Sequence, residues 1–180
     1  MFSTLALLAA LLMAGVVFYA STRPDTFRVA RSTVIAAAPS KIFPLINDLH
    51  GFNRWNPFLK LDPDVRIGYL GPDSGKGARH TWEGNGKVGA GSLEIKDSLP
   101  PSNIVMALDM LKPMAAQNRV EFTLEPVNTR PPSDTTRVTW AMTGTSTLLS
   151  KVMGMCFDMD DMVGKSFEQG LADLKTIAEA

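Results

Sequence analysis

The chain has 180 residues, and its 18 Lys and Arg residues are balanced by 18 Asp and Glu residues, so no excess positive charge is present to attract nucleic acid. The single cysteine, Cys156, excludes an intramolecular disulfide and a cysteine-based zinc site, and the two histidines, His50 and His80, restrict acid–base and metal chemistry. Removing the uncharged residues 1–22 leaves roughly 155 residues, the size of one domain with a single core.

Residues 1–22 contain no charged side chain, and residues 5–20 are almost wholly apolar. A helix of about 20 residues spans roughly 30 Å, the thickness of the hydrocarbon core of a bilayer. A cleaved signal peptide would have a basic residue before the apolar run and small residues next to the cut, but here no Lys or Arg precedes the run and Phe18 lies close to a cut after Ala20. We therefore predict a retained transmembrane anchor over residues 1–22.

Basic residues follow this segment. Arg23, Arg28 and Arg31 outnumber the single acidic residue Asp25, so the positive-inside rule predicts that the folded domain lies on the cytoplasmic side of the membrane. Residues 23–26 form a short linker, so the domain over residues 27–180 is expected to stay close to the lipid surface.

The first elements of the domain are a strand and two short helices. Residues 27–35 are rich in Val, Thr and Ile and predict a strand. Pro39 suits the first turn of a helix, where its missing N–H is not needed, and this helix continues to Asn47. A second helix over residues 49–55 ends at Asn56-Pro57, because a residue before proline is disfavoured in the helical region.

Alternation of apolar and polar side chains predicts six more strands, near residues 65–69, 78–83, 93–96, 104–111, 119–125 and 137–142. Such strands have one buried and one solvent-exposed face, the antiparallel pattern. Asn85-Gly86 predicts a hairpin with a type I′ turn. The run Gly84–Gly89 also matches GxGxxG, but a strand rather than a helix follows it, so a turn is predicted instead of a dinucleotide site.

The last segment has a helical period. Apolar residues recur every three or four positions and predict a long amphipathic helix, in which Gly154 indicates a bend or a late start. The apolar stripe consists of Leu149, Val152, Cys156, Met159, Val163, Phe167, Gly170, Leu174 and Ile177.

Two stretches of the sequence are similar to a known superfamily. They comprise residues 31–39 with Ile42-Phe43, residues 46–49 and 55–58, and, near the end, residues 162–165, 167–171 and 174–175. Over about residues 27–180 the chain resembles START-like or SRPBCC proteins, and within them polyketide cyclase/dehydrase-like proteins. The resemblance implies an α+β helix-grip fold, a curved antiparallel sheet wrapped around a long C-terminal helix, here preceded by the N-terminal transmembrane helix. It implies a cavity between sheet and helix, and no family catalytic residue matches this sequence.

The predicted ligand is therefore a hydrophobic small molecule or lipid. His80 and Trp82 share one strand face, so we expect His80 to orient the ligand, unless it is a core histidine bonded to a backbone carbonyl. Methionines cluster between Met106 and Met162, which suits an adaptable interior, although a solid Met-rich core is the alternative. The expected ligand-binding residues are His80, Trp82, Met106, Leu108, Phe122, Trp140, Met142, Met159, Val163 and Phe167.

Two other functions are considered. One is a cyclase/dehydrase-like enzyme with His80 as general acid–base, which a second titratable group within hydrogen-bond reach would favour. The other is a protein-interaction module similar to chaperone activators, with the cavity filled by side chains. No cofactor or metal is expected, since Asp158, Asp160 and Asp161 fit a solvated helix face. The predicted partners are the hydrophobic ligand and, through the N-terminal helix, the membrane, with no nucleic acid.

Overall fold

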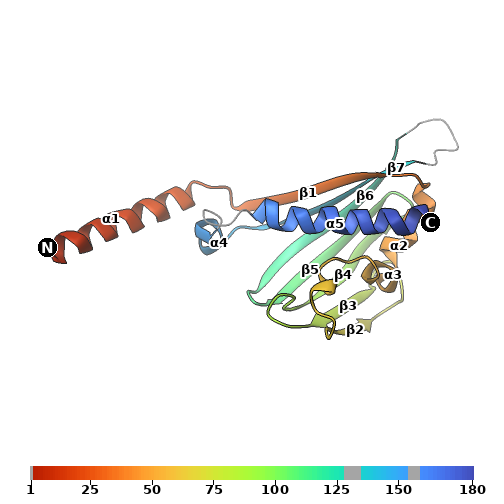
Figure 1. The fold of residues 1–180 in the computed structure, drawn as a ribbon, viewed down its shortest axis with the longest axis horizontal. Coiled ribbons are helices and arrows are strands. Elements are labelled where there is room, and N and C mark those ends of the chain that lie inside the picture. Colours follow the sequence, from red (N-terminus) through yellow and green to blue (C-terminus); the bar gives the residue numbers. More distant parts are fainter. Residues whose placement is uncertain (1, 128–134, 154–158) are drawn as a thin grey trace.

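The computed structural model describes residues 2–127, 135–153 and 159–180. The helices come first and last in the chain, and the strands lie mostly between them (Figure 1). In chain order the elements are α1 (Phe2–Ser21), β1 (Thr26–Ile35), α2 (Pro39–Asn47), α3 (Leu49–Asn53), the 3-10 helix η1 (Leu59–Leu61), β2 (Arg66–Leu70), β3 (Arg79–Glu83), β4 (Ala90–Leu99), β5 (Asn103–Lys112), β6 (Ala116–Pro126), β7 (Thr136–Thr145), α4 (Leu148–Met153) and α5 (Met159–Glu179).

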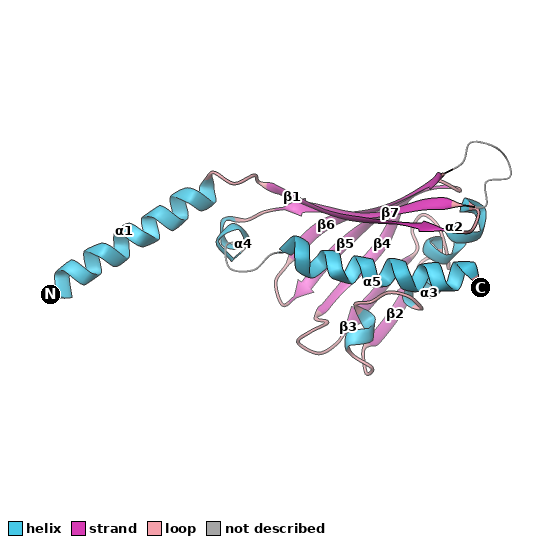
Figure 2. Ribbon diagram, turned by 45° about the horizontal axis from the view of Figure 1, so that its top comes forward, coloured by secondary structure: helices cyan, strands magenta, loops and turns pink. Residues whose placement is uncertain are grey.

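Within the described residues, seven strands form one antiparallel sheet in the order β1-β7-β6-β5-β4-β3-β2. Two register shifts interrupt the pairing of β4 with β5, one between Ala90 and Gly91 and one between Ile95 and Asp97. Such bulges bend a strand and increase its twist. The sheet is accordingly curved, and α5 lies across one of its faces (Figure 2). This is the helix-grip arrangement that the resemblance implied.

The short helices form as their sequences predict. Pro39 occupies the first turn of α2, and Asp48 ends it. The Asp48 carboxylate then accepts a hydrogen bond from the backbone N–H of His50 and so caps α3. The helix ends at Asn53, two residues earlier than predicted. This tight α2–α3 connection brings the side chains of α3 towards the sheet.

The hairpin between β3 and β4 is present, but the predicted type I′ turn is wrong. Positive φ occurs at Gly89, at 69°, and not at Asn85 or Gly86. The Asn85 side-chain oxygen instead accepts hydrogen bonds from the backbone N–H groups of Lys87 and Val88. An asparagine side chain can replace a backbone turn in this way.

The apolar stripe of α5 packs on the sheet. Phe167 and Leu174 of the predicted stripe are buried, and Leu171 and Ala178, which the prediction did not include, are buried beside them. All four join the inward side chains of the strands in one core. The predicted bend near Gly154, together with Cys156 and Asp158, lies outside the described residues.

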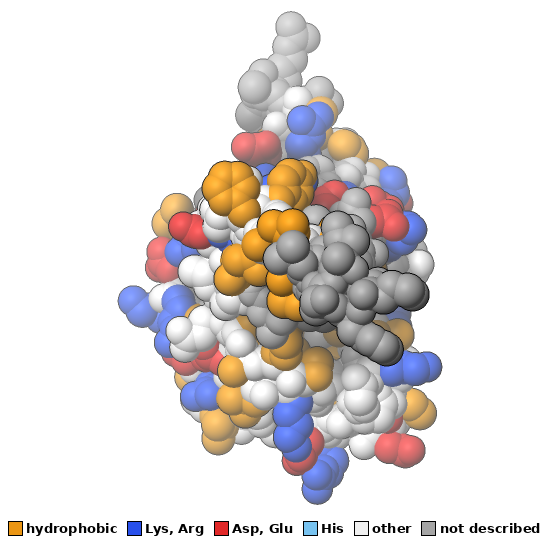
Figure 3. All heavy atoms as spheres, turned by 90° about the vertical axis from the view of Figure 1, so that its left-hand side faces the viewer, with side chains coloured by type: hydrophobic (Ala, Val, Ile, Leu, Met, Phe, Trp, Pro, Cys, Tyr) orange, Lys and Arg blue, Asp and Glu red, His pale blue; other side chains and the backbone are white. Residues whose placement is uncertain are grey.

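The N-terminal prediction needs correction. Helix α1 projects from the sheet and contacts α4, and hydrophobic side chains gather on the side of the molecule where it leaves the domain (Figures 1 and 3). In the part of the chain that the structure describes, no helix has both the length and the apolar character needed to cross a membrane. The predicted transmembrane anchor over residues 1–22 is therefore wrong. The single-pass membrane localisation and the cytoplasmic orientation, which both depended on it, are wrong with it.

The physical reason lies in the length of the apolar run. The prediction counted every uncharged residue from 1 to 22, including Ser3 and Thr4 at one end and Ser21 and Thr22 at the other. Residues 5–20 alone rise only about 24 Å as an α-helix, whereas the hydrocarbon core is roughly 30 Å thick.

Candidate functional site

The predicted ligand-binding residues of the strands lie on the face of the sheet that α5 covers, here called the inner face. Trp140 of β7 stacks on Phe167 of α5, with ring centroids 4.1 Å apart and planes 10° from parallel. Phe122 of β6 lies 5.0 Å from Trp140. Met106 and Met142 are buried, and Leu108 and Val163 pack partly buried against the core. Met159 begins α5, but its side chain is not among those described.

The segment from α3 to η1 completes this aromatic group. Phe52 lies 4.8 Å from Trp55, and Trp55 lies 5.6 Å from Trp140 and 5.9 Å from Phe122, all edge to face. Phe58 meets Phe167 edge to face at 6.3 Å. Edge-to-face and offset contacts are the favourable geometries of aromatic pairs. These side chains therefore form a closely packed interior between β6, β7 and α5.

The indole N–H of Trp140 has no partner in this interior. Its Nε1 atom is buried, and no hydrogen-bond partner lies within reach among the described residues. The other two tryptophans are satisfied, since Trp55 donates to the backbone oxygen of Leu45 at 2.9 Å and Trp82 to that of Val88 at 3.3 Å. A buried donor without an acceptor costs about 1–3 kcal/mol. Trp140 thus presents an unused donor inside an apolar aromatic group.

His80 is held as a neutral imidazole next to this group. It is only 1 % exposed, and its Nδ1 lies 3.0 Å from the side-chain nitrogen of Asn53. The amide oxygen of Asn53 accepts from Asn56, so its nitrogen is the donor to His80 and the ring proton sits on Nε2. Burial lowers the pKa of His80 to about 4, so the ring is uncharged at neutral pH. The Nε2–H makes no hydrogen bond to another described residue.

A line of rings connects His80 to the surface. The exposed ring of His50 stacks on the ring of Tyr69, with their centroids 3.7 Å apart. The centroid of the Tyr69 ring lies 6.3 Å from that of His80. The centroid of the Trp82 ring lies 5.5 Å from that of His80. Asn53 also donates to the Tyr69 hydroxyl at 2.9 Å. Phe52 contacts both His80 and Trp140, so the polar group around His80 and the aromatic group around Trp140 are neighbours.

Sequence reasoning missed Asn53, Tyr69 and Phe52 as members of the site. Tyr69 belongs because β2 pairs with β3 in a register that places it opposite His80. Asn53 and Phe52 belong because α3 is positioned over these strands. Alternation in the sequence predicted the strands, but no local pattern specifies which residue of a distant helix meets them.

The chemistry that this arrangement offers is hydrogen-bond donation in apolar surroundings. The hydrogen-bond partner of His80 is the amide of Asn53, which does not titrate. Across the described ranges, no group of His, Cys, Asp and Glu side chains is placed to hold a metal ion. Two N–H groups, on Trp140 and His80, are therefore the polar features available to a molecule in the interior.

Similar structures share the fold at low sequence identity. Truncated norcoclaurine synthase from Thalictrum flavum is 7% identical, with a TM-score of 0.66, and the match covers 84% of this chain and 92% of that one. Ginseng major latex-like protein 151 from Panax ginseng is 10% identical, with a TM-score of 0.60 and coverage of 87% and 100%. The Aha1 dimer from Colwellia psychrerythraea is 17% identical, with a TM-score of 0.58 and coverage of 85% and 96%. No curated protein matches the sequence.

The family is shown by the sequence itself. The model of the family described as polyketide cyclase / dehydrase and lipid transport matches residues 26–179, nearly the whole chain after α1. The predicted resemblance to SRPBCC proteins of the polyketide cyclase/dehydrase kind is confirmed. The chain therefore belongs to the polyketide cyclase/dehydrase and lipid transport family.

Proposed function

We propose that the domain binds a hydrophobic small molecule or lipid that carries a hydrogen-bond acceptor, in the interior between the sheet and α5. The observation that carries this proposal is the buried N–H of Trp140, which lacks an acceptor. In the free protein this unpaired donor lowers the stability by about 1–3 kcal/mol, and a ligand oxygen that accepts its hydrogen bond would remove that penalty. The Nε2–H of His80 is the second donor.

The side chains around the two donors determine the polarity and charge of the ligand that fits. Phe122, Phe167 and Met106 are buried and carry no charge, so they favour an apolar body. A ligand charge in this interior would lose its hydration without gaining an ion pair, which is strongly unfavourable. A neutral carbonyl, ester or hydroxyl oxygen on an aromatic or aliphatic body is the chemistry that fits.

Entry of such a ligand requires the packed rings to separate. Val163 is only partly buried, whereas Phe167, one turn further along α5, is 1 % exposed. Separating α5 from the sheet near Val163 therefore loses less packing than separating them near Phe167. We expect the ligand to enter at the Val163 end.

A protein-interaction module is kept as the second candidate. The stacking of Trp140 on Phe167 at 4.1 Å favours it, because side chains that fill the interior leave less room for a ligand. An enzyme that uses His80 gains no comparable support. The neutral ring of His80 could accept a proton, but no second titratable group is hydrogen-bonded to this ring among the described residues.

A matched pair of probes tests the proposal. Naphthalene and 2-acetylnaphthalene have the same apolar body, and only the second carries a carbonyl acceptor. We expect 2-acetylnaphthalene to bind the full chain about tenfold more tightly than naphthalene, the effect of one hydrogen bond to a buried donor. The substitutions Trp140→Phe and His80→Phe should each reduce this advantage while keeping an aromatic ring in place.

Trp82→Phe is the control, because the Trp82 N–H already has a backbone partner. It should leave the ratio between the two probes unchanged. If neither probe binds the unmodified chain, the interior is a solid core and the interaction module replaces the proposal. If the probes do bind, native mass spectrometry of the purified chain would identify a co-purified ligand.

A further inference from the structure

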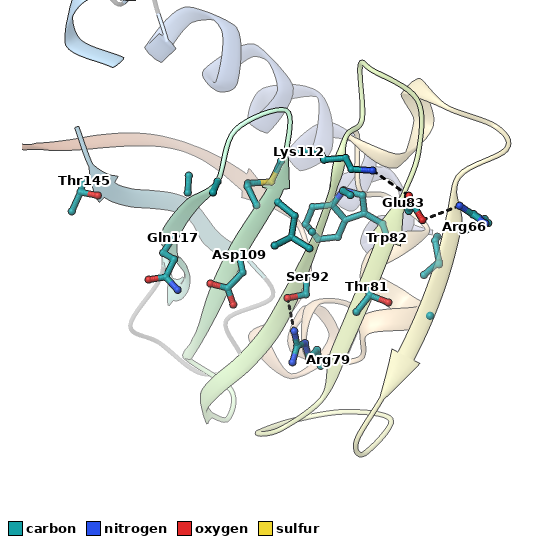
Figure 4. A pocket seen from close by; sticks show the side chains of 18 residues that line it. Arg66, Arg79, Thr81, Trp82, Glu83, Ser92, Asp109, Lys112, Gln117 and Thr145 are labelled. Carbon is teal, nitrogen blue, oxygen red and sulfur yellow. Dashed lines mark hydrogen bonds and ion pairs between the residues drawn. The ribbon is translucent and has the colours of Figure 1, made fainter. Parts of the chain in front are cut away.

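The face of the sheet turned away from α5, here called the outer face, holds a groove with a volume of about 1080 Å³. Its floor is a row of polar side chains, since Thr81 pairs with Ser92, Ser92 with Asp109, and Asp109 with Gln117. Register partners share one face of a sheet. Thr81 lies between His80 and Trp82, which point inward, so the row points outward. Figure 4 shows it crossing the strands from Thr81 to Thr145.

A second groove of about 730 Å³ continues the first across β6, β7 and β1. The two grooves share Gln117 and Thr145 as lining residues. In the second groove Arg28 pairs with Thr143, and Thr143 pairs with Arg119. Neighbouring strands lie about 4.8 Å apart, so the backbones of the two arginines are roughly 10 Å apart, within reach of one anion between them.

The charges of the second groove favour an anion. Its lining residues include two arginines and no carboxylate. Arg119 approaches Glu121 at 3.7 Å, an exposed ion pair of the kind that contributes little, and Arg28 makes no ion pair with a described residue. The hydroxyl of Thr143 between them adds a donor. Planar guanidinium groups match the oxygens of phosphate especially well.

The first groove has a different character. Its cations Arg66 and Lys112 both pair with Glu83, at 2.8 and 3.4 Å. Arg79 donates to the Ser92 hydroxyl at 2.9 Å, and no ion pair joins Asp109 to a described residue. A carboxylate and an amide side by side, Asp109 and Gln117, accept hydrogen bonds from hydroxyl groups. This groove therefore suits the uncharged, hydroxyl-bearing part of a molecule.

We propose that the outer face carries a second binding site, for a hydroxyl-bearing phosphate ester. The phosphate lies between Arg28 and Arg119 at Thr143, and the hydroxyl groups lie at Asp109 and Gln117. The site is separated from the interior by the sheet and does not depend on the proposed interior ligand. The phosphate ester can be a free metabolite or the headgroup of a phospholipid, which share this chemistry.

Titration calorimetry of the full chain with glycerol 3-phosphate and with inorganic phosphate tests the soluble source. Arg28→Gln and Arg119→Gln should each weaken both ligands about tenfold, the effect of losing one charge-assisted contact. Asp109→Asn should weaken glycerol 3-phosphate and leave inorganic phosphate unweakened. Arg137→Gln is the matched control, because Arg137 is an exposed arginine of β7 outside both grooves, and it should change neither affinity.

Sedimentation with phosphatidylcholine vesicles, with and without phosphatidic acid, tests the lipid source. Extra binding to the phosphatidic acid vesicles that is lost in Arg28→Gln and kept in Arg137→Gln assigns the site to a headgroup. Binding of glycerol 3-phosphate alone, with the same dependence on Arg28, assigns it to a free ester. The proposal is overturned if neither source binds, or if Arg137→Gln weakens binding as much as Arg28→Gln does.

Discussion

Replacing His80 with Asn should make the stability of the protein less sensitive to acid. The folded-state pKa of His80 is lowered by burial from 6.5 to about 4. Well above pH 6.5 the ring is neutral in both folded and unfolded chains and contributes no pH dependence. As the pH falls from about 6.5 towards 4, the unfolded chain binds a proton that the folded chain does not, so the free energy of unfolding decreases.

The size of the effect follows from the two pKa values. Near pH 4.5 this single group should lower the free energy of unfolding by about 2.5 kcal/mol, and by about 3 kcal/mol once both states are protonated. Asparagine does not titrate, and its side-chain oxygen can still accept from Asn53. The His80→Asn variant should therefore lack this loss while keeping the local hydrogen bond.

Urea unfolding followed by circular dichroism, at about pH 7 and about pH 4.5 and at one ionic strength, measures the difference. Carboxylates titrate in both proteins, so their contribution cancels when the two pH-induced losses are subtracted. We expect the unmodified chain to lose about 2.5 kcal/mol more than the variant. Equal losses would show that the pKa of His80 is not lowered and would refute the assignment of a desolvated neutral ring.

Four further substitutions probe the packing around the site and the fold that supports it. Phe167→Ala should lower the free energy of unfolding by about 3–5 kcal/mol, because the ring is buried and stacked on Trp140, and a loss below about 2 kcal/mol would indicate an existing cavity. Val163→Phe should be tolerated at this partly buried position but should weaken the binding of 2-acetylnaphthalene, and unchanged binding would place the ligand elsewhere. Gly170→Ala should destabilise by about 1–3 kcal/mol, since its Cβ would lie 2.8 Å from the Trp140 ring, and a stabilised variant would contradict this close contact. Asp62→Ala should cost about 1–3 kcal/mol by removing the acceptor of two backbone N–H groups, and a neutral effect in urea unfolding would argue against that role.

The elements themselves follow from local patterns. Strict alternation around Phe122 and Trp140 indicates strands with one buried face, and both side chains are buried in the structure. The spacing of three and four residues through Phe167 and Leu174 predicts α5, because side chains at that spacing lie on one face of a helix, and both side chains are buried. Pro39 marks the start of α2 because its fixed backbone angle suits the first helical turn.

The site depends on contacts that local patterns do not contain. His80 meets Asn53 across 27 positions of sequence because of how α3 packs on β3. The hairpin turn was mispredicted because Asn85 uses its side chain rather than a left-handed backbone. The transmembrane prediction failed because it counted the polar residues at both ends of the uncharged segment as part of the membrane span.

The indole N–H signal of Trp140 in a ¹⁵N–¹H correlation spectrum tests the proposed interior site most directly. The chain has three tryptophans, and Trp55 and Trp82 serve as internal controls because both already donate to backbone oxygens. On addition of 2-acetylnaphthalene, the Trp140 signal should move downfield as its N–H gains an acceptor, while naphthalene should not produce this shift. The Trp55 and Trp82 signals, whose N–H groups keep their backbone acceptors, should not show this difference between the two probes. Binding of 2-acetylnaphthalene without a downfield shift at Trp140, or no binding at all, would contradict the account.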